Sequence, residues 1–235
     1  MKRGYLLNYN QIKQLSSAFF LTNRYGFRLR KLPDPTDKKR LRLEYSQILL
    51  SRLNISVKVE NAEKLPLDGQ YLLFSNHRSI IDPLVIDIAF KQSKIFGLWV
   101  SKKELYDSLF FGMAVRNGGC VRVDREENNM SLFFSDIKNG LAEGSSIFIF
   151  PEGTRNKTSR DILEFKNGFR AIALKNRLPM LPVYIKTDTG KVLRKALHNS
   201  TKNQEITIVI GDTIDYKMKD PVAVYCTMFG LESSC

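Results

Sequence analysis

The chain has 235 residues, of which 43% are hydrophobic, so it can bury the core of one large domain and is not expected to be disordered. Its 37 Lys and Arg residues outnumber its 24 Asp and Glu residues, and this net charge of +13 predicts an anionic partner: nucleic acid, a membrane surface or a phosphorylated substrate. Three cysteines and two histidines share no metal-ligand spacing, so we expect reduced thiols, no metal and no disulfide framework. No apolar run reaches the ~18 residues of a transmembrane helix.

Residues 1–53 carry 12 of the basic residues and only 3 acidic ones. Apolar residues at helical spacing predict one helix over residues 6–25 and a second over 37–53, separated by a turn at Pro33 and Pro35. The first apolar stripe comprises Ile12, Leu15, Phe19 and Phe20. Basic amphipathic helices of this kind lie in bilayer interfaces with their cations near lipid phosphates. The alternative is that both stripes pack on the main domain.

From residue 54 onward, short apolar runs alternate with helical segments. The predicted strands are 55–60, 71–75, 95–100, 120–123, 146–150, 180–185 and 205–210, and the predicted helices are 82–91, 102–109, 129–142 and 169–175. This alternation predicts a layered α/β domain with a mostly parallel central sheet flanked by helices, preceded by the two N-terminal helices. In such a domain, functional side chains gather at the carboxyl ends of the strands.

The run that follows the predicted strand 71–75 contains His77 and Asp82. Histidine suits proton abstraction because it exchanges protons near neutral pH, and a carboxylate bonded to one ring nitrogen leaves the other free to accept a proton. The spacing also fits a second role for Asp82, that of a helix N-cap followed by Pro83 at the first helical position. The pattern alone leaves a catalytic pair and a helix cap as alternatives.

Two further polar clusters follow predicted strands. Arg125 lies just past strand 120–123, where its planar guanidinium suits phosphate oxygens, although a surface ion pair with Asp124 is a simpler explanation. Strand 146–150 leads into the run 151–155, where a proline and a glycine predict a stiff turn that presents charged side chains. The alternative for this run is an ordinary polar loop.

Taken in order, these runs resemble four motifs of the glycerolipid acyltransferase family, which includes 1-acylglycerol-3-phosphate (lysophosphatidic acid) acyltransferases. The matches are Asn-His-x-x-x-x-Asp at 76–82, a Gly-to-Arg block at 119–125, Phe-Pro-Glu-Gly-Thr-Arg at 150–155 and an apolar block around Pro182. The resemblance covers residues 54–210, and it implies that residues 54–235 form an acyltransferase domain.

The resemblance implies that His77 deprotonates a glycerol hydroxyl and that Asp82 holds its imidazole. The hydroxyl oxygen would attack a fatty-acyl thioester carried on acyl carrier protein or coenzyme A, with no metal or bound cofactor. Family analogy places six residues at the acceptor and its phosphate: Lys102, Arg125, Glu152, Gly153, Thr154 and Arg155. Among them, Glu152 is expected to orient a basic residue or the acceptor rather than to act as the base.

The implied reaction is acyl transfer to lysophosphatidic acid, which gives phosphatidic acid in phospholipid biosynthesis. Glycerol 3-phosphate or another lysophospholipid is an alternative acceptor. A lipid acceptor requires access to a bilayer, and this favours membrane association through residues 1–53 and a peripheral protein on the cytoplasmic face of a membrane. A non-catalytic basic membrane-binding protein is the alternative from another class. The sequence contains no nucleic-acid-binding motif and no Gly-x-Ser-x-Gly nucleophile elbow, so neither nucleic acid nor a lipase reaction is expected.

Overall fold

The computed structural model describes residues 8–124, 130–199 and 201–231 of the chain. Within these residues a seven-stranded sheet has the order β1-β7-β6-β2-β5-β3-β4. The strands are β1 (Ile55–Glu60), β2 (Leu72–Ser75), β3 (Gly97–Lys102), β4 (Cys120–Val123), β5 (Ser146–Ile149), β6 (Met180–Ile185) and β7 (Gln204–Ile210). Only the β6–β7 pairing is antiparallel. The predicted α/β domain with a mostly parallel sheet is therefore confirmed.

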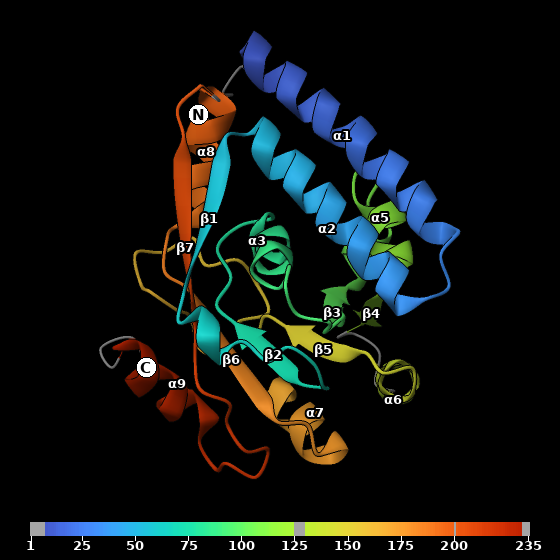
Figure 1. Ribbon diagram of the computed structural model, residues 1–235, viewed down its shortest axis with the longest axis vertical. Coiled ribbons are helices and arrows are strands. Elements are labelled where there is room, and N and C mark those ends of the chain that lie inside the picture. Colours follow the sequence, from blue (N-terminus) through green and yellow to red (C-terminus); the bar gives the residue numbers. More distant parts are fainter. Residues whose placement is uncertain (1–7, 125–129, 200, 232–235) are drawn as a thin grey trace, which may run out of the picture.

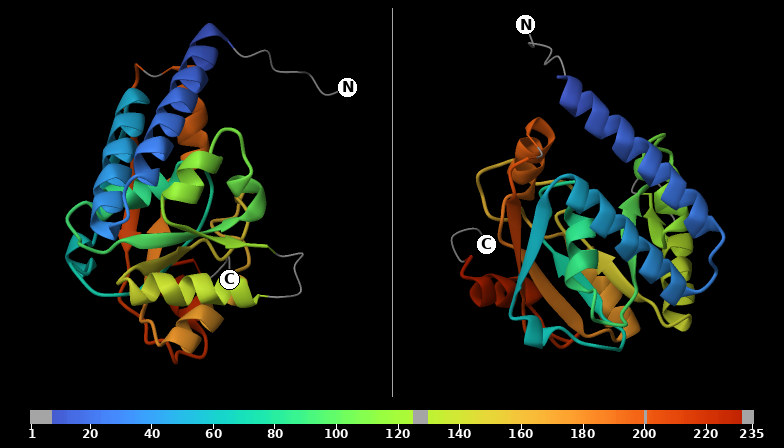
Figure 2. Two further views of the ribbon diagram at one scale, coloured as in Figure 1. Left: turned by 90° about the vertical axis from the view of Figure 1, so that its right-hand side faces the viewer. Right: turned by 45° about the horizontal axis from the view of Figure 1, so that its top comes forward.

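Helices cover both faces of the sheet (Figure 1). They are α1 (Tyr9–Arg30), α2 (Pro35–Arg52), α3 (Asp82–Ala89), α4 (Lys103–Tyr106), α5 (Gly112–Asn117), α6 (Ser131–Ala142), α7 (Gly168–Asn176), α8 (Thr189–His198) and α9 (Pro221–Phe229), with a short 3-10 helix, η1 (Ala62–Lys64). One apolar cluster joins the sheet to α2, α3 and α8, and a second joins it to α6, α7 and α9. Figure 2 (left) shows α1 and α2 on the side of the sheet opposite α6 and α7.

The central strands are buried on both faces because helices cover the sheet from each side. Every residue of β2 and β6 is buried, which explains why these strands are continuous apolar runs rather than alternating ones. Gly97 in β3 allows a close approach: a Cβ there would lie 2.3 Å from the Phe148 ring. The sheet is therefore tightly packed where β3 and β5 meet.

The sequence analysis missed three helices, α5, α8 and α9. The two longer of these helices, α8 and α9, have side-chain caps at their N-termini. The carboxylate of Asp188 accepts a hydrogen bond from the amide of Lys191, and the carboxylate of Asp220 accepts one from the amide of Ala223. In α9, Tyr225 is fully buried and donates a hydrogen bond to the carbonyl of Val183 at 3.0 Å. Cys226 is disulfide-bonded, so the expectation of three reduced thiols is wrong.

The N-terminal helices, α1 and α2, pack directly against the rest of the domain. Leu50 at the end of α2 belongs to the same apolar cluster as β1, β6 and β7, and α1 lies against α2 and α5. Lys39 donates hydrogen bonds to the carbonyls of Phe90 (3.1 Å) and Ser93, and burial lowers the pKa of its ammonium group to about 8. In the described part of the chain, no helix combines the length and the apolar character that crossing a membrane requires.

Arg42 of α2 makes a buried ion pair with α3 and hydrogen bonds with two further segments. Its guanidinium contacts the Asp87 carboxylate of α3 at 2.6 Å and donates to the carbonyls of Gly97 (2.7 Å) and Gly118 (3.3 Å). The two charged side chains are only 9% and 13% exposed, respectively. The position of α2 is thus fixed by a specific polar contact in addition to apolar packing.

Candidate active site

The sequence motifs converge because the strands that carry them run in the same direction. β2 is parallel to both β5 and β6, and β3 is parallel to β5 and β4, so the carboxyl ends of these five strands lie along one edge of the sheet. The Asn-His-x-x-x-x-Asp run follows β2, and the Pro-Glu-Gly-Thr-Arg run follows β5. The expectation that these motifs share an edge of the sheet is confirmed.

His77 and Asp82 form a hydrogen-bonded pair. Nδ1 of His77 lies 2.8 Å from Oδ2 of Asp82. The Asp82 side chain is completely buried, whereas 18% of the His77 side chain is exposed. Because Asp82 engages Nδ1, the other ring nitrogen, Nε2, is left to meet a substrate. In this arrangement a buried carboxylate can hold a histidine in one tautomer, which is what a general base requires.

The carboxylate of Asp82 receives three hydrogen bonds besides that of the histidine. Oδ2 accepts from the backbone amides of Arg78 (2.7 Å) and Ser79 (2.8 Å), and Oδ1 accepts from the hydroxyl of Thr189 at 2.5 Å. Asp82 is the first residue of α3, and the N-cap residue, Ile81, makes no side-chain cap. Asp82 therefore turns back to hold the loop of residues 76–81, the candidate catalytic loop, and the simple helix-cap alternative is wrong.

Neighbouring side chains hold both the backbone and the ring of His77 in place. Asn76 is fully buried, and its side-chain amide makes two hydrogen bonds with the backbone of Ile185, which join the ends of β2 and β6. The imidazole stacks on Phe150 with ring centroids 4.1 Å apart, and Phe150 stacks in turn on Trp99 at 4.8 Å. The first motif thus supplies structural contacts as well as the candidate base, His77.

Glu152 contacts the catalytic loop directly. Its Oε1 accepts a hydrogen bond from the backbone amide of His77 at 2.8 Å, and the residue is only 2% exposed. Burial raises the pKa of this carboxyl group to about 7, against the opposing effect of the backbone amides of His77 and Leu163. We expected Glu152 to orient a basic residue or the acceptor, but the partner that the structure gives it is the backbone amide of His77.

The raised pKa of Glu152 predicts a pH-dependent stability. The folded protein holds this proton more tightly than the unfolded chain, whose carboxyl group has the ordinary pKa of 4.5, so the free energy of unfolding falls as pH rises from 4.5 to about 7. At full ionisation the loss is roughly 3 kcal/mol. Glu152→Gln should remove this slope, as measured by urea unfolding at several pH values between 4.5 and 7.5.

The matched control for this experiment is Glu205→Gln, because Glu205 is an exposed glutamate on β7. That variant should keep the slope of the wild-type protein. Equal slopes in wild type and Glu152→Gln would show that Glu152 is not the titrating group.

The other predicted substrate residues lie at the same edge of the sheet but are more open. Gly153 has a positive φ of 63°, the backbone geometry of a tight turn that favours glycine. Thr154 and Arg155 are exposed after this turn, and Lys102 is exposed at the end of β3. Arg125 lies outside the described residues. Its neighbour Asp124 forms an ion pair with Lys103 at 2.7 Å.

Sequence reasoning missed Thr189. The signal was present, because Thr189 follows β6, whose carboxyl end lies beside that of β2 in the same parallel sheet. We considered only the apolar block of this strand, around Pro182, and not the polar residues just after it. Functional side chains gather at the carboxyl ends of parallel strands, and Thr189 lies close to such an end.

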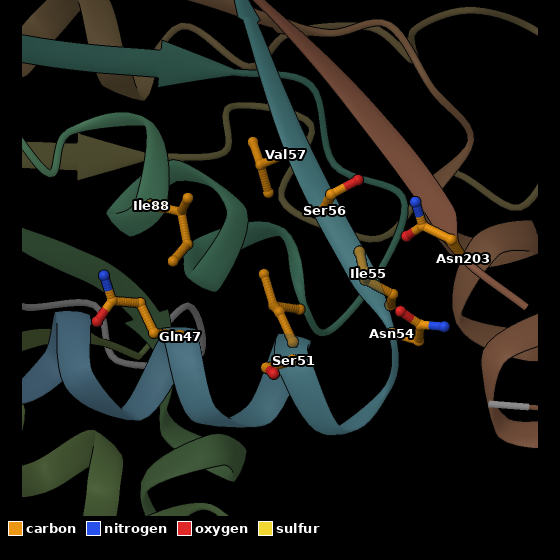
Figure 3. A pocket seen from close by; sticks show the side chains of 9 residues that line it. Gln47, Ser51, Asn54, Ile55, Ser56, Val57, Ile88 and Asn203 are labelled. Carbon is orange, nitrogen blue, oxygen red and sulfur yellow. The ribbon is translucent and has the colours of Figure 1, made fainter. Parts of the chain in front are cut away.

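A hollow of about 310 Å³ lies between the end of α2, the start of β1 and α3 (Figure 3). Its nine lining residues, all within the described chain, include neutral polar side chains such as Gln47, Ser51 and Asn203 alongside apolar ones such as Leu50 and Ile88. None of the predicted site residues is among them, and none carries a formal charge. This hollow therefore does not suit a phosphate and does not include the candidate site residues.

Comparisons with known proteins agree with the geometry. A family model described as Acyltransferase matches residues 56–186. The 1-acyl-sn-glycerol-3-phosphate acyltransferase of Bacillus subtilis is 33% identical over 169 residues, which cover 72% of this chain and 78% of that protein. The enzyme of the same name from Helicobacter pylori is 34% identical over 118 residues, which cover 50% of this chain and 48% of that protein, so the match spans about half of that relative's length.

A solved structure has the same fold. The crystal structure of the 1-acyl-sn-glycerophosphate (LPA) acyltransferase from Thermotoga maritima superposes with a TM-score of 0.66 at 21% identity and covers 95% of each chain. Together, the fold and the histidine–aspartate pair define an α/β protein with a mostly parallel seven-stranded sheet and a candidate active site at the carboxyl edge of that sheet. The chain belongs to the acyltransferase family.

Proposed function

We propose that the protein transfers a fatty acyl group from an acyl thioester to the free hydroxyl of lysophosphatidic acid, giving phosphatidic acid. The observation that carries this proposal is the 2.8 Å contact between His77 and the buried Asp82, with His77 partly exposed at the carboxyl edge of the sheet. The printed names of the relatives support the choice of acceptor. The geometry also argues against a non-catalytic membrane-binding protein, which has no use for a buried carboxylate aimed at a histidine.

The chemistry follows from the position of His77. Nε2 accepts the proton of the acceptor hydroxyl as its oxygen attacks the thioester carbonyl carbon. The new C–O bond forms a tetrahedral intermediate, and the C–S bond then breaks. The histidine returns the proton to the leaving thiolate, so the carrier, acyl carrier protein or coenzyme A, departs as a thiol. The exposed cations Lys102 and Arg155 lie at the same edge of the sheet and suit the phosphate of the acceptor.

The test is acyl transfer by the purified protein with both donor types and a panel of acceptors. We expect phosphatidic acid from lysophosphatidic acid, and much less product from a monoacylglycerol that lacks the phosphate. A preference for glycerol 3-phosphate or another lysophospholipid would replace the proposed acceptor. An absence of transfer to every acceptor from both donors would reject the enzymatic proposal.

We further propose that α1 binds the surface of a membrane. Three aromatic side chains, Tyr9, Phe20 and Phe27, are 79%, 71% and 55% exposed, respectively. At 100° per residue they lie along one line of the helix, and exposed cations follow each of them four positions later. These cations are Lys13, Arg24 and Lys31. Interleaved aromatic and basic side chains suit the boundary between acyl chains and anionic headgroups.

The exposed line differs from the expected stripe of Ile12, Leu15, Phe19 and Phe20. Phe19 packs against Phe110 with ring centroids 5.4 Å apart, and this contact draws it away from solvent. Leu109, which directly precedes Phe110 in the sequence, is 86% exposed. The connection from the end of β3 to α5 thus contributes apolar surface beside α1, the first helix of the chain, which lies at the upper right of Figure 1.

Phe20→Ser/Phe27→Ser should weaken binding to vesicles that contain anionic phospholipid by at least about tenfold. Each aromatic ring that becomes buried in the membrane contributes about 1.5–3 kcal/mol to the free energy of binding. Sedimentation with the vesicles measures the bound fraction. The matched control is Leu132→Ser/Leu174→Ser, which removes two apolar side chains that are 65% and 53% exposed on α6 and α7. Equal weakening by both double variants would contradict a specific role of α1.

A further inference from the structure

Thr189, the first residue of α8, touches the catalytic pair from outside the family motifs. Its hydroxyl donates to Oδ1 of Asp82 at 2.5 Å, and both side chains are completely inaccessible to solvent. The other carboxylate oxygen, Oδ2, serves His77 and the catalytic-loop amides. Each oxygen of the carboxylate therefore has its own donors, and Thr189 alone, among the described residues, engages Oδ1 with a side chain.

This hydroxyl is not needed to cap α8. Asp188 is the N-cap residue, and its side chain accepts from the amide of Lys191 at 2.9 Å. A threonine at the first position of a helix does not need to bond the helix itself when the cap residue already does so. The Thr189 hydroxyl is therefore free to point across to Asp82.

The start of α8 is held against the catalytic loop by several contacts. A Cβ at Gly190 would lie 3.3 Å from the carbonyl oxygen of Arg78, which shows how closely the two segments approach. The guanidinium of Arg78 in turn lies 3.9 Å from the carboxylate of Asp188. These contacts leave little freedom for Thr189 to move away from Asp82.

We propose that Thr189 is a positioning residue for the acyl transfer proposed above, acting through Asp82 on the orientation of the His77 imidazole. A hydrogen bond to Oδ1 stops the carboxylate from rotating about its Cβ–Cγ bond, so Oδ2 stays in line with Nδ1 of His77. It also disperses the negative charge of a carboxylate that is wholly removed from water. Without it, the imidazole is held less firmly and Nε2 is less often aligned with the acceptor hydroxyl.

Thr189→Val is nearly isosteric and removes only the hydroxyl, so kcat should fall about tenfold or more while KM stays close to that of the wild type. Thr189→Ser restores the hydroxyl and should restore most of kcat. Thr189→Ala gives a second test without a β-branched side chain. The matched control is Thr187→Val, two residues earlier, because the Thr187 hydroxyl accepts from the amide of Thr207 instead.

A second readout does not depend on activity. The chain has two histidines, so the Nδ1 proton of His77 can be assigned by NMR with His198→Ala as the reference. Its resonance should move in Thr189→Val, return in Thr189→Ser and stay in place in Thr187→Val. An unmoved resonance in Thr189→Val, or a kcat equal to that of the wild type, would overturn the positioning role. If the wild-type protein transfers no acyl group, the proposed function fails, and the resonance still decides the role of Thr189.

Discussion

His77→Ala should lower kcat for acyl transfer by about a thousandfold and leave KM within about twofold of the wild-type value. A general base contributes about 10²–10⁴ to the rate, and it acts on the transition state rather than on substrate binding. The remaining three donors to Asp82, two backbone amides and Thr189, stay in place, so the fold should persist. Steady-state kinetics with the best acceptor and donor would measure the effect.

The other histidine provides the control. His198 is exposed at the end of α8, and its ring is 3.5 Å from the side chain of Asn8. His198→Ala should have the kinetics of the wild type. If His77→Ala kept more than a tenth of the wild-type kcat with an intact fold, His77 would not be the base.

Arg42→Met should reduce the free energy of unfolding by about 3–5 kcal/mol, the largest effect on stability that we expect from a single substitution. The methionine fills similar space but leaves the Asp87 carboxylate, whose side chain is only 13% exposed, without its 2.6 Å partner. An uncompensated buried charge carries a penalty of this size. Urea or thermal unfolding of the wild type and the variant would measure it.

Two variants sharpen this test. Arg40→Met breaks an ion pair of similar length, 3.0 Å to Asp37, in which the two side chains are 81% and 45% exposed, and it should cost less than about 1 kcal/mol. Arg42→Met/Asp87→Leu removes both charges and should recover much of the loss. Similar effects of Arg40→Met and Arg42→Met would contradict a special role for burial.

The sequence predicted the sheet well because its strands are sharply bounded. The observed bounds of β1, β4 and β6 are those predicted, since apolar residues alternate with polar ones in β1, valines flank Arg122 in β4 and β6 is a continuous apolar run. The convergence of the motifs was predictable too, because the carboxyl ends of parallel strands share one edge of the sheet. His77 and Asp82 were identified for this reason and for their match to the family motif.

Helices outside the motifs were harder to predict. The segment that becomes α8 has a glycine at its second position and several charges, so its sequence alone resembles a loop, and its apolar residues matter only once β6 and β7 are in place. The role of a charged residue is also hard to predict from the sequence alone. The excess of Lys and Arg in residues 1–53 suggested an anionic partner, but the structure uses Lys39 and Arg42 for internal contacts. Composition does not distinguish a cation that stabilises the fold from one that faces a ligand.

The Glu152 contact was unpredictable for a related reason. Glu152 and His77 are 75 residues apart, and the bond joins a side chain to a backbone amide, which leaves no pattern of residue types in the sequence. Only the pairing of β2 with β5 brings them together.

The catalytic loop after β2 has no regular secondary structure, yet its backbone is almost fully bonded. The amide of His77 is held by Glu152 and its carbonyl by the amide of Asn156, while Asp82 holds the amides of Arg78 and Ser79. Amides held in this way exchange with solvent deuterium only when the bonding groups separate. The loop should therefore be protected almost as strongly as the central strands, and its opening should require the local unfolding of β2, β5 and α3 together. We therefore expect the base that we propose, His77, to be held in place before a substrate binds.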